Sequence, residues 1–441
     1  MSSSKKTIAI VGGGILGMTL ALRLAQRGFK VTVLEASDRI GGLAAPAKIG
    51  PYMWDKFYHV ILMSDSNTLG LLEELDLADQ INWRTAKTGF FTDGRLLSMS
   101  NVFEFLTFPP LKLPDKIRLG WTIFYGSKIK SWQRLEGISV SEWLTLHSGK
   151  RTFDKIWLPL LKSKLGENYK ITSASFIWAI ISRMYAARRS GMKQEMFGYA
   201  RGGYAQILER FRTRLDEMGI ETVCQTQVSK IENNGNKVML KTDTRKSLEF
   251  DLAALTLPCT LIPDLCSQLS ASEKERLLEV TYEGVLCLSL ILKKNLADYY
   301  VTNITDEWVP FTAVIEMTAL VDKGHFEGNS LVYLPRYLTD NDPYREKGDA
   351  EITEEFIAAL QSMYPTFTRD DVLFHRMSRA NHVLPIPTTH YSTTLLPPTG
   401  TSLKNVFVVN SAQIANGTMN VNEIIALANI KAVEITDLLS E

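Results

Sequence analysis

The sequence predicts an α/β fold with a parallel sheet, and its first three elements give the main reasons. Thr7 to Val11 is a short apolar run typical of a buried parallel strand. The glycines that follow it, at positions 12, 14 and 17, have the spacing of a tight turn between strand and helix. A helical apolar pattern runs from Ile15 to Arg27, and a second β-branched strand covers Val31 to Leu34. This order predicts a βαβ unit.

The glycines of the turn have separate physical roles. Gly12 permits the tight turn, Gly14 lets the backbone approach a pyrophosphate, and Gly17 lets helix and strand pack closely. The helix N-terminus, with Ile15 and Leu16, offers unpaired N–H groups and a positive dipole end to the phosphates. A lone glycine turn can be purely steric, so the surrounding strand, helix and strand carry the argument.

An acidic residue completes this site. Glu35 ends the second strand, where a carboxylate accepts the hydroxyls of an adenosine ribose. The set therefore predicts a binding site for the ADP half of a dinucleotide. Glu35 by itself does not separate NAD from FAD.

Length and composition bound the class of protein. The 441 residues suit two domains that share an interface. A hydrophobic fraction of 45%, with 10% aromatic residues, excludes a disordered or fibrous chain. With 49 basic against 48 acidic residues, no global field favours nucleic acid.

The cysteines and apolar runs indicate the compartment. Four cysteines show no CxxC spacing, which favours buried thiols in a reducing cytosol over disulfides or a metal site; they are Cys224, Cys259, Cys266 and Cys287. Met1 to Lys6 has no apolar signal region, and the longest apolar runs are only as long as strands. We expect a cytoplasmic protein.

The next segment carries a family resemblance. Glu35 to Leu43, with sequence EASDRIGGL, resembles the stretch after the second strand in the superfamily of FAD-dependent amine oxidases, protoporphyrinogen oxidases and phytoene desaturases. The resemblance implies non-covalent FAD, with the basic residue near the phosphates and the paired glycines along the diphosphate. The implied contacts are Glu35, Ala36, Arg39, Gly41, Gly42 and Leu43.

The resemblance extends over nearly the whole chain and implies its domains. It implies a Rossmann-like, glutathione reductase-like FAD-binding domain built from three separated segments, residues 1–85, 198–268 and 393–441. Residues 86–197 (helical) and 269–392 (a sheet) would form an α+β substrate domain. The pattern itself supports helices at 139–144, 153–165, 173–188, 204–215, 351–363 and 422–438.

Further cofactor contacts follow from the resemblance. The backbone of Val228 would pair with the adenine edge, and the strand before Pro258 would belong to the same domain. Relatives end a late strand in Gly-Asp, whereas this chain has Asn410 and Ser411 there, both uncharged. The loop with Thr418, Met419 and Asn420 would present backbone N–H groups to the flavin O2, unless it is only an N-cap.

Candidate catalytic residues lie on two segments. Trp54 to Ile61 resembles a strand that runs beside the flavin, so Tyr58 or His59 would face the ring. In the later sheet Arg336 could hold an anionic group, or be an ordinary solvated charge. Polar residues near it in sequence are Glu316, Tyr333, Tyr337, Arg379 and His382.

The resulting hypothesis is an FAD-dependent dehydrogenase or oxidase. It would take a hydride to flavin N5 from a largely apolar substrate, with or without an anionic group. The alternatives are a mutase similar to UDP-galactopyranose mutase, with Arg336 and Arg379 on a pyrophosphate, and a non-catalytic flavoprotein.

A basic block suggests a second kind of contact. Residues 101–200 contain 16 Lys or Arg and 7 Asp or Glu, with tryptophans interspersed. Such a block could touch an anionic membrane surface, guide an anionic substrate or be a solvated face. We expect weak peripheral membrane contact around Phe103 to Trp132.

Overall fold

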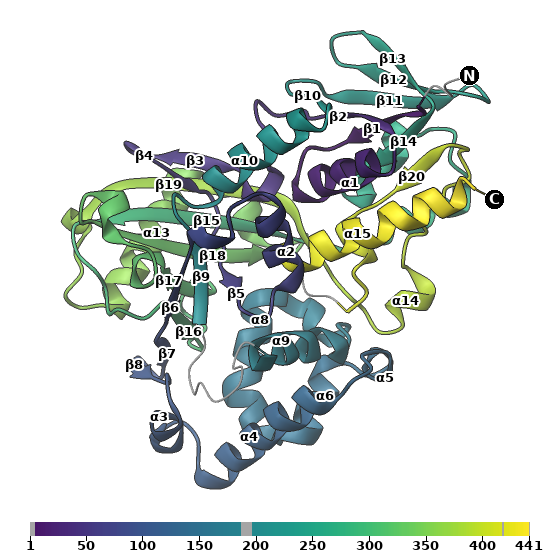
Figure 1. The fold of residues 1–441 in the computed structure, drawn as a ribbon. Coiled ribbons are helices and arrows are strands. Elements are labelled where there is room, and N and C mark those ends of the chain that lie inside the picture. Colours follow the sequence, from purple (N-terminus) through teal and green to yellow (C-terminus); the bar gives the residue numbers. More distant parts are fainter. Residues whose placement is uncertain (1–4, 187–195, 417–418, 441) are drawn as a thin grey trace.

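The computed structural model of the protein describes residues 5–186, 196–416 and 419–440. Figure 1 shows a parallel sheet at one end, a second sheet beside it and a helical part at the other end.

The parallel sheet has five strands in the order β10-β2-β1-β14-β20. Their bounds are Glu221–Val223, Lys30–Leu34, Thr7–Val11, Leu252–Leu255 and Val406–Val408. The central strand β1 pairs with β2 on one side and with β14 on the other, both in parallel. Strands from three distant parts of the sequence therefore form one sheet.

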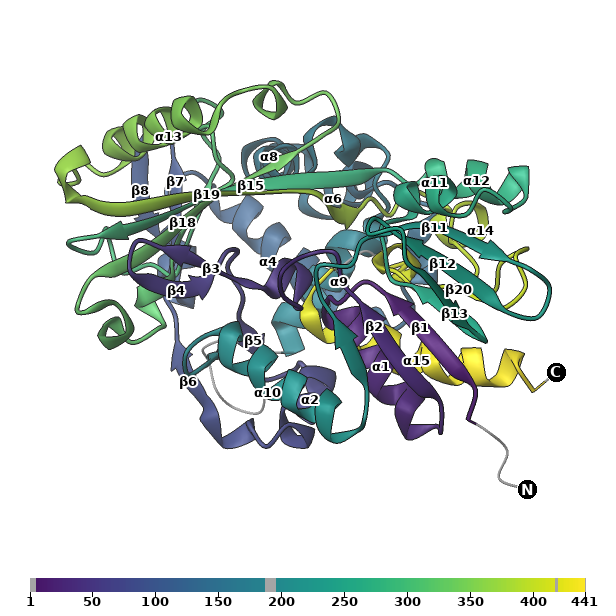
Figure 2. The same ribbon diagram turned by 90° about the horizontal axis from the view of Figure 1, so that it is seen from above.

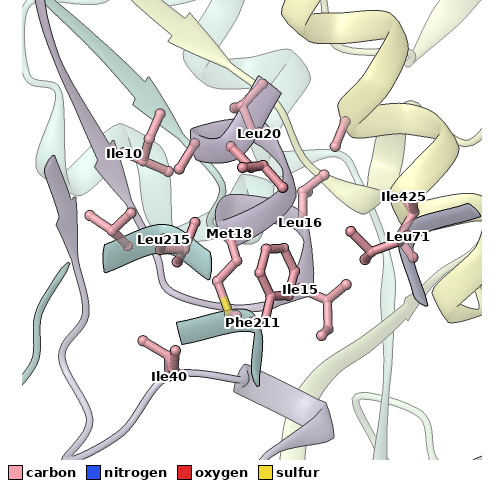
Figure 3. Packing of buried hydrophobic residues seen from close by; sticks show 14 of the residues in the cluster. Ile10, Ile15, Leu16, Met18, Leu20, Ile40, Leu71, Phe211, Leu215 and Ile425 are labelled. Carbon is pink, nitrogen blue, oxygen red and sulfur yellow. The ribbon is translucent and has the colours of Figure 1, made fainter. Parts of the chain in front are cut away.

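The two faces of this sheet are covered differently. Ile8 and Ile10 of β1 face helices α1, α2, α10 and α15, whereas Ala9 and Val11 face the small sheet β11–β13 and helices α11 and α12. Figure 3 shows Met18 of α1 packed against Phe211 of α10. The four helices of the first face are Ile15–Gln26, Ser66–Glu74, Tyr204–Glu217 and Val421–Leu438. On the second face the elements are Val228–Asn233, Val238–Thr242, Ser247–Phe250, Ile262–Leu265 and Ala271–Leu278.

The second sheet has seven strands in the order β19-β15-β18-β17-β16-β7-β8. Their bounds are Val372–Pro385, Tyr282–Leu292, Ser330–Leu338, Ala313–Glu316, Val301–Ile304, Thr88–Thr92 and Arg95–Ser98. Figure 2 shows α13 (Asp349–Met363) on one side of β15 and β18, and the hairpin of β3 (Pro46–Ile49) and β4 (Tyr52–Asp55) on the other. Leu286 and Leu334 pack toward α13, whereas Cys287 and Tyr333 pack toward Trp54 of the hairpin. Side-chain alternation thus gives this sheet two separate cores.

The helical part contains the main helices α3 (Val102–Thr107), α4 (Leu113–Lys128), α6 (Val140–Ser148), α8 (Leu158–Leu165) and α9 (Ala174–Ala186). The helix expected from Phe153 to Leu165 is divided into a π-helical turn, Phe153–Trp157, and α8.

The expected strand Trp54 to Ile61 is wrong beyond Asp55. β4 ends there, and β5 is only Ile61–Leu62. The partner strand of β4 is β3, which begins at Pro46, and Pro46 pairs with Asp55. Because proline has no N–H to donate, the ladder does not continue past this pair.

We predict that Gly17→Ala lowers the free energy of unfolding by about 3 kcal/mol. A Cβ at Gly17 would lie 1.9 Å from the Gly12 carbonyl oxygen and 3.0 Å from Thr256 Oγ1. Urea unfolding measures the change. The control is Gly70→Ala in α2, where a Cβ meets nothing within 4 Å; it should stabilise the helix slightly. Equal stability of the two variants would contradict the close packing.

Candidate functional site

The first turn is built as its glycines predict. Gly12 has φ +113°, a conformation that glycine adopts readily, and its N–H donates to the Leu34 carbonyl at 2.9 Å. Gly14 is the N-cap residue of α1, and a Cβ there would meet only Gly42 Cα, at 3.9 Å. The backbone at Gly14 therefore faces open space at the N-terminus of α1, where Ile15 and Leu16 begin the helix.

The second glycine pair lies directly on this turn. The Gly41 N–H donates to the Gly13 carbonyl at 2.8 Å. Gly41 and Gly42 have φ of +118° and +57°, and a Cβ on Gly42 would lie 3.1 Å from Gly14 Cα. Only glycine permits this approach of two backbones. Leu43, next in the chain, packs against the core under the hairpin.

Glu35 lies beside the turn as expected. Its Oε2 accepts from the Gly13 N–H at 2.6 Å, and its Oε1 accepts from the Ser37 N–H at 2.8 Å. The Glu35 carbonyl accepts from the N–H of Thr226, two residues before the buried Val228 that starts β11. The structure thus brings the predicted ribose and adenine contacts together.

The next two predicted contacts are exposed. Ala36 and Arg39 both reach solvent. Arg39 pairs with Asp38 at 3.0 Å, which lowers the pKa of that carboxyl. No cofactor phosphate is needed to account for the position of Arg39.

The side chain of Asn410 has hydrogen-bond partners within the protein. It is buried, its Oδ1 accepts from the Ala412 N–H at 3.1 Å, and its Nδ2 lies 3.2 Å from Cys259 Sγ. The side chain caps a short 3-10 helix and has no group turned outward. Ser411 is partly exposed, and Pro258 caps the turn that begins at Cys259.

The loop before α15 offers unpaired polar atoms. Asn420 is the N-cap of α15, and its Oδ1 accepts from the Glu423 N–H at 3.1 Å. Within the described residues, its Nδ2 and the Oδ1 of Asn416 are buried without a partner. Such atoms fit a polar ligand at this helix N-terminus. Met419 packs against the helical part, and Thr418 lies outside the described residues.

Tyr58 and His59 follow the end of β4 on the hairpin side of the second sheet. The Tyr58 hydroxyl lies 3.2 Å from that of Tyr337, and burial raises the Tyr58 pKa. His59 Nδ1 donates to the Phe57 carbonyl at 2.9 Å, and its ring lies 4.8 Å from that of Tyr204. Burial lowers the His59 pKa to about 4, so the imidazole is neutral at pH 7.

The predicted anion-binding arginines lie on the opposite face. Arg336 and Arg379 both pair in register with Leu286, whose side chain faces α13. Arg336 donates to the Pro310 carbonyl at 2.8 Å and to Asp342 at 2.9 Å. Arg379 donates to Asp349 at 2.7 Å, and its Nη2 donates to a backbone carbonyl. Both guanidinium groups hold loops together and point away from Tyr58, so the structure does not bring Arg336 together with Tyr58 and His59.

The remaining polar candidates have structural partners. Glu316 is buried and accepts from three backbone N–H groups, those of residues 296, 297 and 298. The Tyr333 hydroxyl donates to the Asp55 carbonyl at 2.6 Å. His382 lies edge-on to Tyr282 at 5.4 Å. The Tyr337 hydroxyl and the Tyr333 ring, whose centre is 6.4 Å from that of Tyr58, both lie beside Tyr58.

Two contacts between the helical part and the second sheet were missed by sequence reasoning. Lys164 Nζ lies 3.5 Å from the Tyr337 hydroxyl and 4.6 Å from the centre of its ring. Asn168 donates to Glu283 Oε1 at 2.8 Å. Glu283 is fully buried, its Oε2 has no partner among the described residues, and burial raises its pKa to about 7. In the sequence, only the charged residue Glu283 within an otherwise apolar strand could have indicated the pair of Asn168 and Glu283.

Another buried carboxyl supports the hairpin. Asp55 Oδ1 accepts from the Tyr204 N–H at 2.9 Å, and burial raises the Asp55 pKa to about 7. In the unfolded chain this group ionises near 4. The folded form holds its proton up to about pH 7, so stability is lost as pH rises from 4 to 7.

We therefore predict that the stability of Asp55→Asn, relative to that of the unsubstituted protein, increases from pH 5 to pH 8, because the amide cannot ionise. Urea unfolding at the two pH values measures the difference. Asp251→Asn is the control: the Lys237 ammonium and Thr7 lower the Asp251 pKa to about 2, so its effect should be the same at both pH values. An effect of Asp55→Asn on stability that is the same at both pH values would contradict the raised pKa of Asp55.

Comparison with known proteins gives a family match. The model of the family described as flavin containing amine oxidoreductase matches residues 17–420. Protoporphyrinogen oxidase 2 of Arabidopsis thaliana is 27% identical over 165 residues, which are 36% of this chain and 32% of that protein. The chain spans about a third to a half of the length of the curated relatives that it matches first.

Solved structures share the fold over nearly the whole chain. An oxidoreductase from Methanosarcina mazei has a TM-score of 0.75 at 18% identity, covering 97% of this chain and 100% of that one. A reduced UDP-galactopyranose mutase has a TM-score of 0.76 at 14% identity, covering 99% and 97%. At such identities the likeness shows the fold alone.

Proposed function

The chain belongs to the family of flavin-containing amine oxidoreductases and its cofactor is FAD, and we propose that it acts as a dehydrogenase or oxidase on a largely apolar substrate. The resemblance predicted from the glycine turn and the segment 35–43 is confirmed. The substrate and the site residues are parts of the proposal.

The proposal assigns the parallel sheet to a Rossmann-like, glutathione reductase-like domain made from residues 1–85, 198–268 and 393–441. Its five strands come from these three segments. The observation that carries the cofactor assignment is the open space at Gly14, enclosed by the Gly41–Gly42 turn and by Glu35. That space meets the needs of a pyrophosphate, which requires bare backbone and helix N–H groups.

The flavin end is assigned to the loop before α15. Asn420 would donate a hydrogen bond there from its Nδ2, which has no partner among the described residues, and the helix N-terminus would stabilise negative charge. When bound, FAD supplies hydride acceptance at N5. The chain itself holds the cofactor, excludes water and orients the substrate.

The substrate is assigned to the hairpin face of the second sheet, between Tyr58, Tyr337 and helix α8. This face is lined by buried aromatic side chains that favour an apolar molecule. Lys164 places a positive charge beside Tyr337 and suits an anionic group on that molecule. Glu283, with one unpaired oxygen and a pKa of about 7, can take a proton in neutral solution.

The mutase alternative loses its specific support. Arg336 and Arg379 were its candidates for holding a pyrophosphate, and both arginines face α13 with carboxylate partners. Anaerobic addition of apolar candidate substrates tests the main proposal: a dehydrogenase or oxidase bleaches the flavin. Activity that appears only after chemical reduction, without bleaching, would favour the mutase, and no response to either would favour a binding protein.

We predict that Gly14→Val folds but loses FAD, because the side chain fills the space assigned to the pyrophosphate while its Cβ meets only Gly42 Cα, at 3.9 Å. Acid should release FAD from the unsubstituted protein, since the link is expected to be non-covalent. Absorbance and thermal unfolding together report occupancy and folding. Gly348→Val is the matched control, an N-cap glycine with similar φ (−71°) and no neighbour within 4 Å. A folded Gly14→Val protein with full flavin would overturn the phosphate assignment.

We predict that Lys164→Gln raises KM about tenfold for an apolar substrate with a carboxylate, the scale of one charge-assisted contact. The uncharged ester of the same substrate should show no change. Lys162→Gln, on the same helix but paired with Glu307, is the control. Equal KM changes for acid and ester would show that Lys164 does not hold the negative charge.

A further inference from the structure

The outer side of helix α4 carries large apolar residues that the described part of the fold leaves uncovered. Its buried residues are Lys116, Leu119, Thr122 and Gly126, and Leu119 is the one large apolar residue among them, whereas Ile117 and Trp121 on the outer side are 63% and 57% exposed. Surface helices normally direct their large apolar residues inward. The arrangement of α4 therefore needs a partner for its outer side.

Helix α3 extends the same surface. None of its residues is buried, and Phe103 is 74% exposed. The buried Lys116 of α4 donates to the Leu106 carbonyl at 2.7 Å, at the C-terminal end of α3, which fixes one helix against the other. We call this surface the outer face; it comprises Phe103, Leu106, Leu113, Ile117, Trp121 and Phe124.

Two residues that the sequence suggested for this surface belong elsewhere. Phe108 and Leu111 are buried in a small core with Phe90, Leu119 and Ile156. The outer face is thus formed by side chains that the fold leaves uncovered within the described residues.

Positive charge surrounds the outer face. Lys112, Arg118, Lys128 and Lys130 are exposed, and no ion pair joins them to a carboxylate within the part of the chain that the structure describes. The acids nearby are already engaged: Asp115 pairs with Arg151, and Glu104 accepts from Ser98 and Ser100. The face therefore combines apolar side chains with a net positive rim.

A cavity opens at the edge of the same face. It has a volume of about 670 Å³ and lies between α4, α5 and α6, with α5 at Gln133–Glu136. Its apolar wall includes Tyr125, Trp143 and Leu146, and its basic edge includes Lys128, Lys130 and Arg134. This pairing suits an amphiphile with an anionic head.

We propose that the outer face docks on an anionic lipid bilayer. Apolar side chains inserted at the level of the headgroups, with lysines beside them, are the two attractions that hold a peripheral protein. A second copy of the chain fits less well, because two positive rims would repel each other. Figure 1 shows α3 and α4 at the end of the molecule away from the parallel sheet, so docking leaves that sheet free. Among the described residues, no helix is long and apolar enough to cross a bilayer.

The test is co-sedimentation of the holoenzyme with vesicles of phosphatidylcholine, with and without phosphatidylglycerol. We expect binding only to the anionic vesicles, with at least a tenfold decrease at high salt. The double variant Ile117→Ser, Trp121→Ser should bind about tenfold or more weakly. Its control, Ile430→Ser with Trp308→Ser, removes residues of similar exposure, 62% and 52%, and should bind normally.

Two double variants that reverse lysine charges test the electrostatic contribution to vesicle binding separately. Lys128→Glu with Lys130→Glu should abolish binding to the anionic vesicles, whereas Lys246→Glu with Lys404→Glu changes net charge equally and should have a small effect. Flavin absorbance confirms folding of every variant. The proposal is overturned if the protein stays in the supernatant under all conditions, if both charge pairs act equally, or if the apolar variant only dissociates a dimer and leaves vesicle binding unchanged.

Discussion

The close contact between α1 and the end of β1 is the constraint on which the proposed cofactor site depends. Gly17 leaves so little room that a methyl group would overlap the Gly12 carbonyl. The hydroxyl of Thr256 also donates to that carbonyl, at 3.1 Å, from the end of β14. The Gly12 carbonyl oxygen thus lies where helix α1 meets the ends of strands β1 and β14. This contact directs the N-terminus of α1 toward the space beside Gly14.

The two faces of the second sheet have different uses because side chains alternate along its strands. One face packs against α13, and there arginines hold the nearby loops through carboxylates and carbonyls. The other face meets the hairpin and α8, and there Tyr58, Tyr337 and Lys164 lie close together. A change of one residue in strand register would exchange these roles.

The spacing of residues within short segments predicted the glycine turn and Glu35 well. The positions of the other candidate residues depend on pairing between distant segments, and the sequence did not predict that pairing. The turn at Gly12–Gly17, the acid Glu35 and most helices follow from patterns within a few residues. Tyr58 and His59 were expected on a strand, which Pro46 in another segment stops. The position of Arg336 was not predicted, because neither the strand parity that turns it to α13 nor its partner Asp342 can be read from spacing. Lys164 and Glu283 meet their partners only through tertiary packing.

The position of β20 at the edge of the parallel sheet has a consequence for synthesis of the chain. β14 pairs with β20 through Val406 to Val408, so this side of β14 stays unpaired until these residues have been synthesised. An unpaired strand edge is a template for wrong pairing between chains. Nascent chains therefore expose this edge while residues 256–405 are made, and chaperones that shield such edges should raise the yield of folded protein.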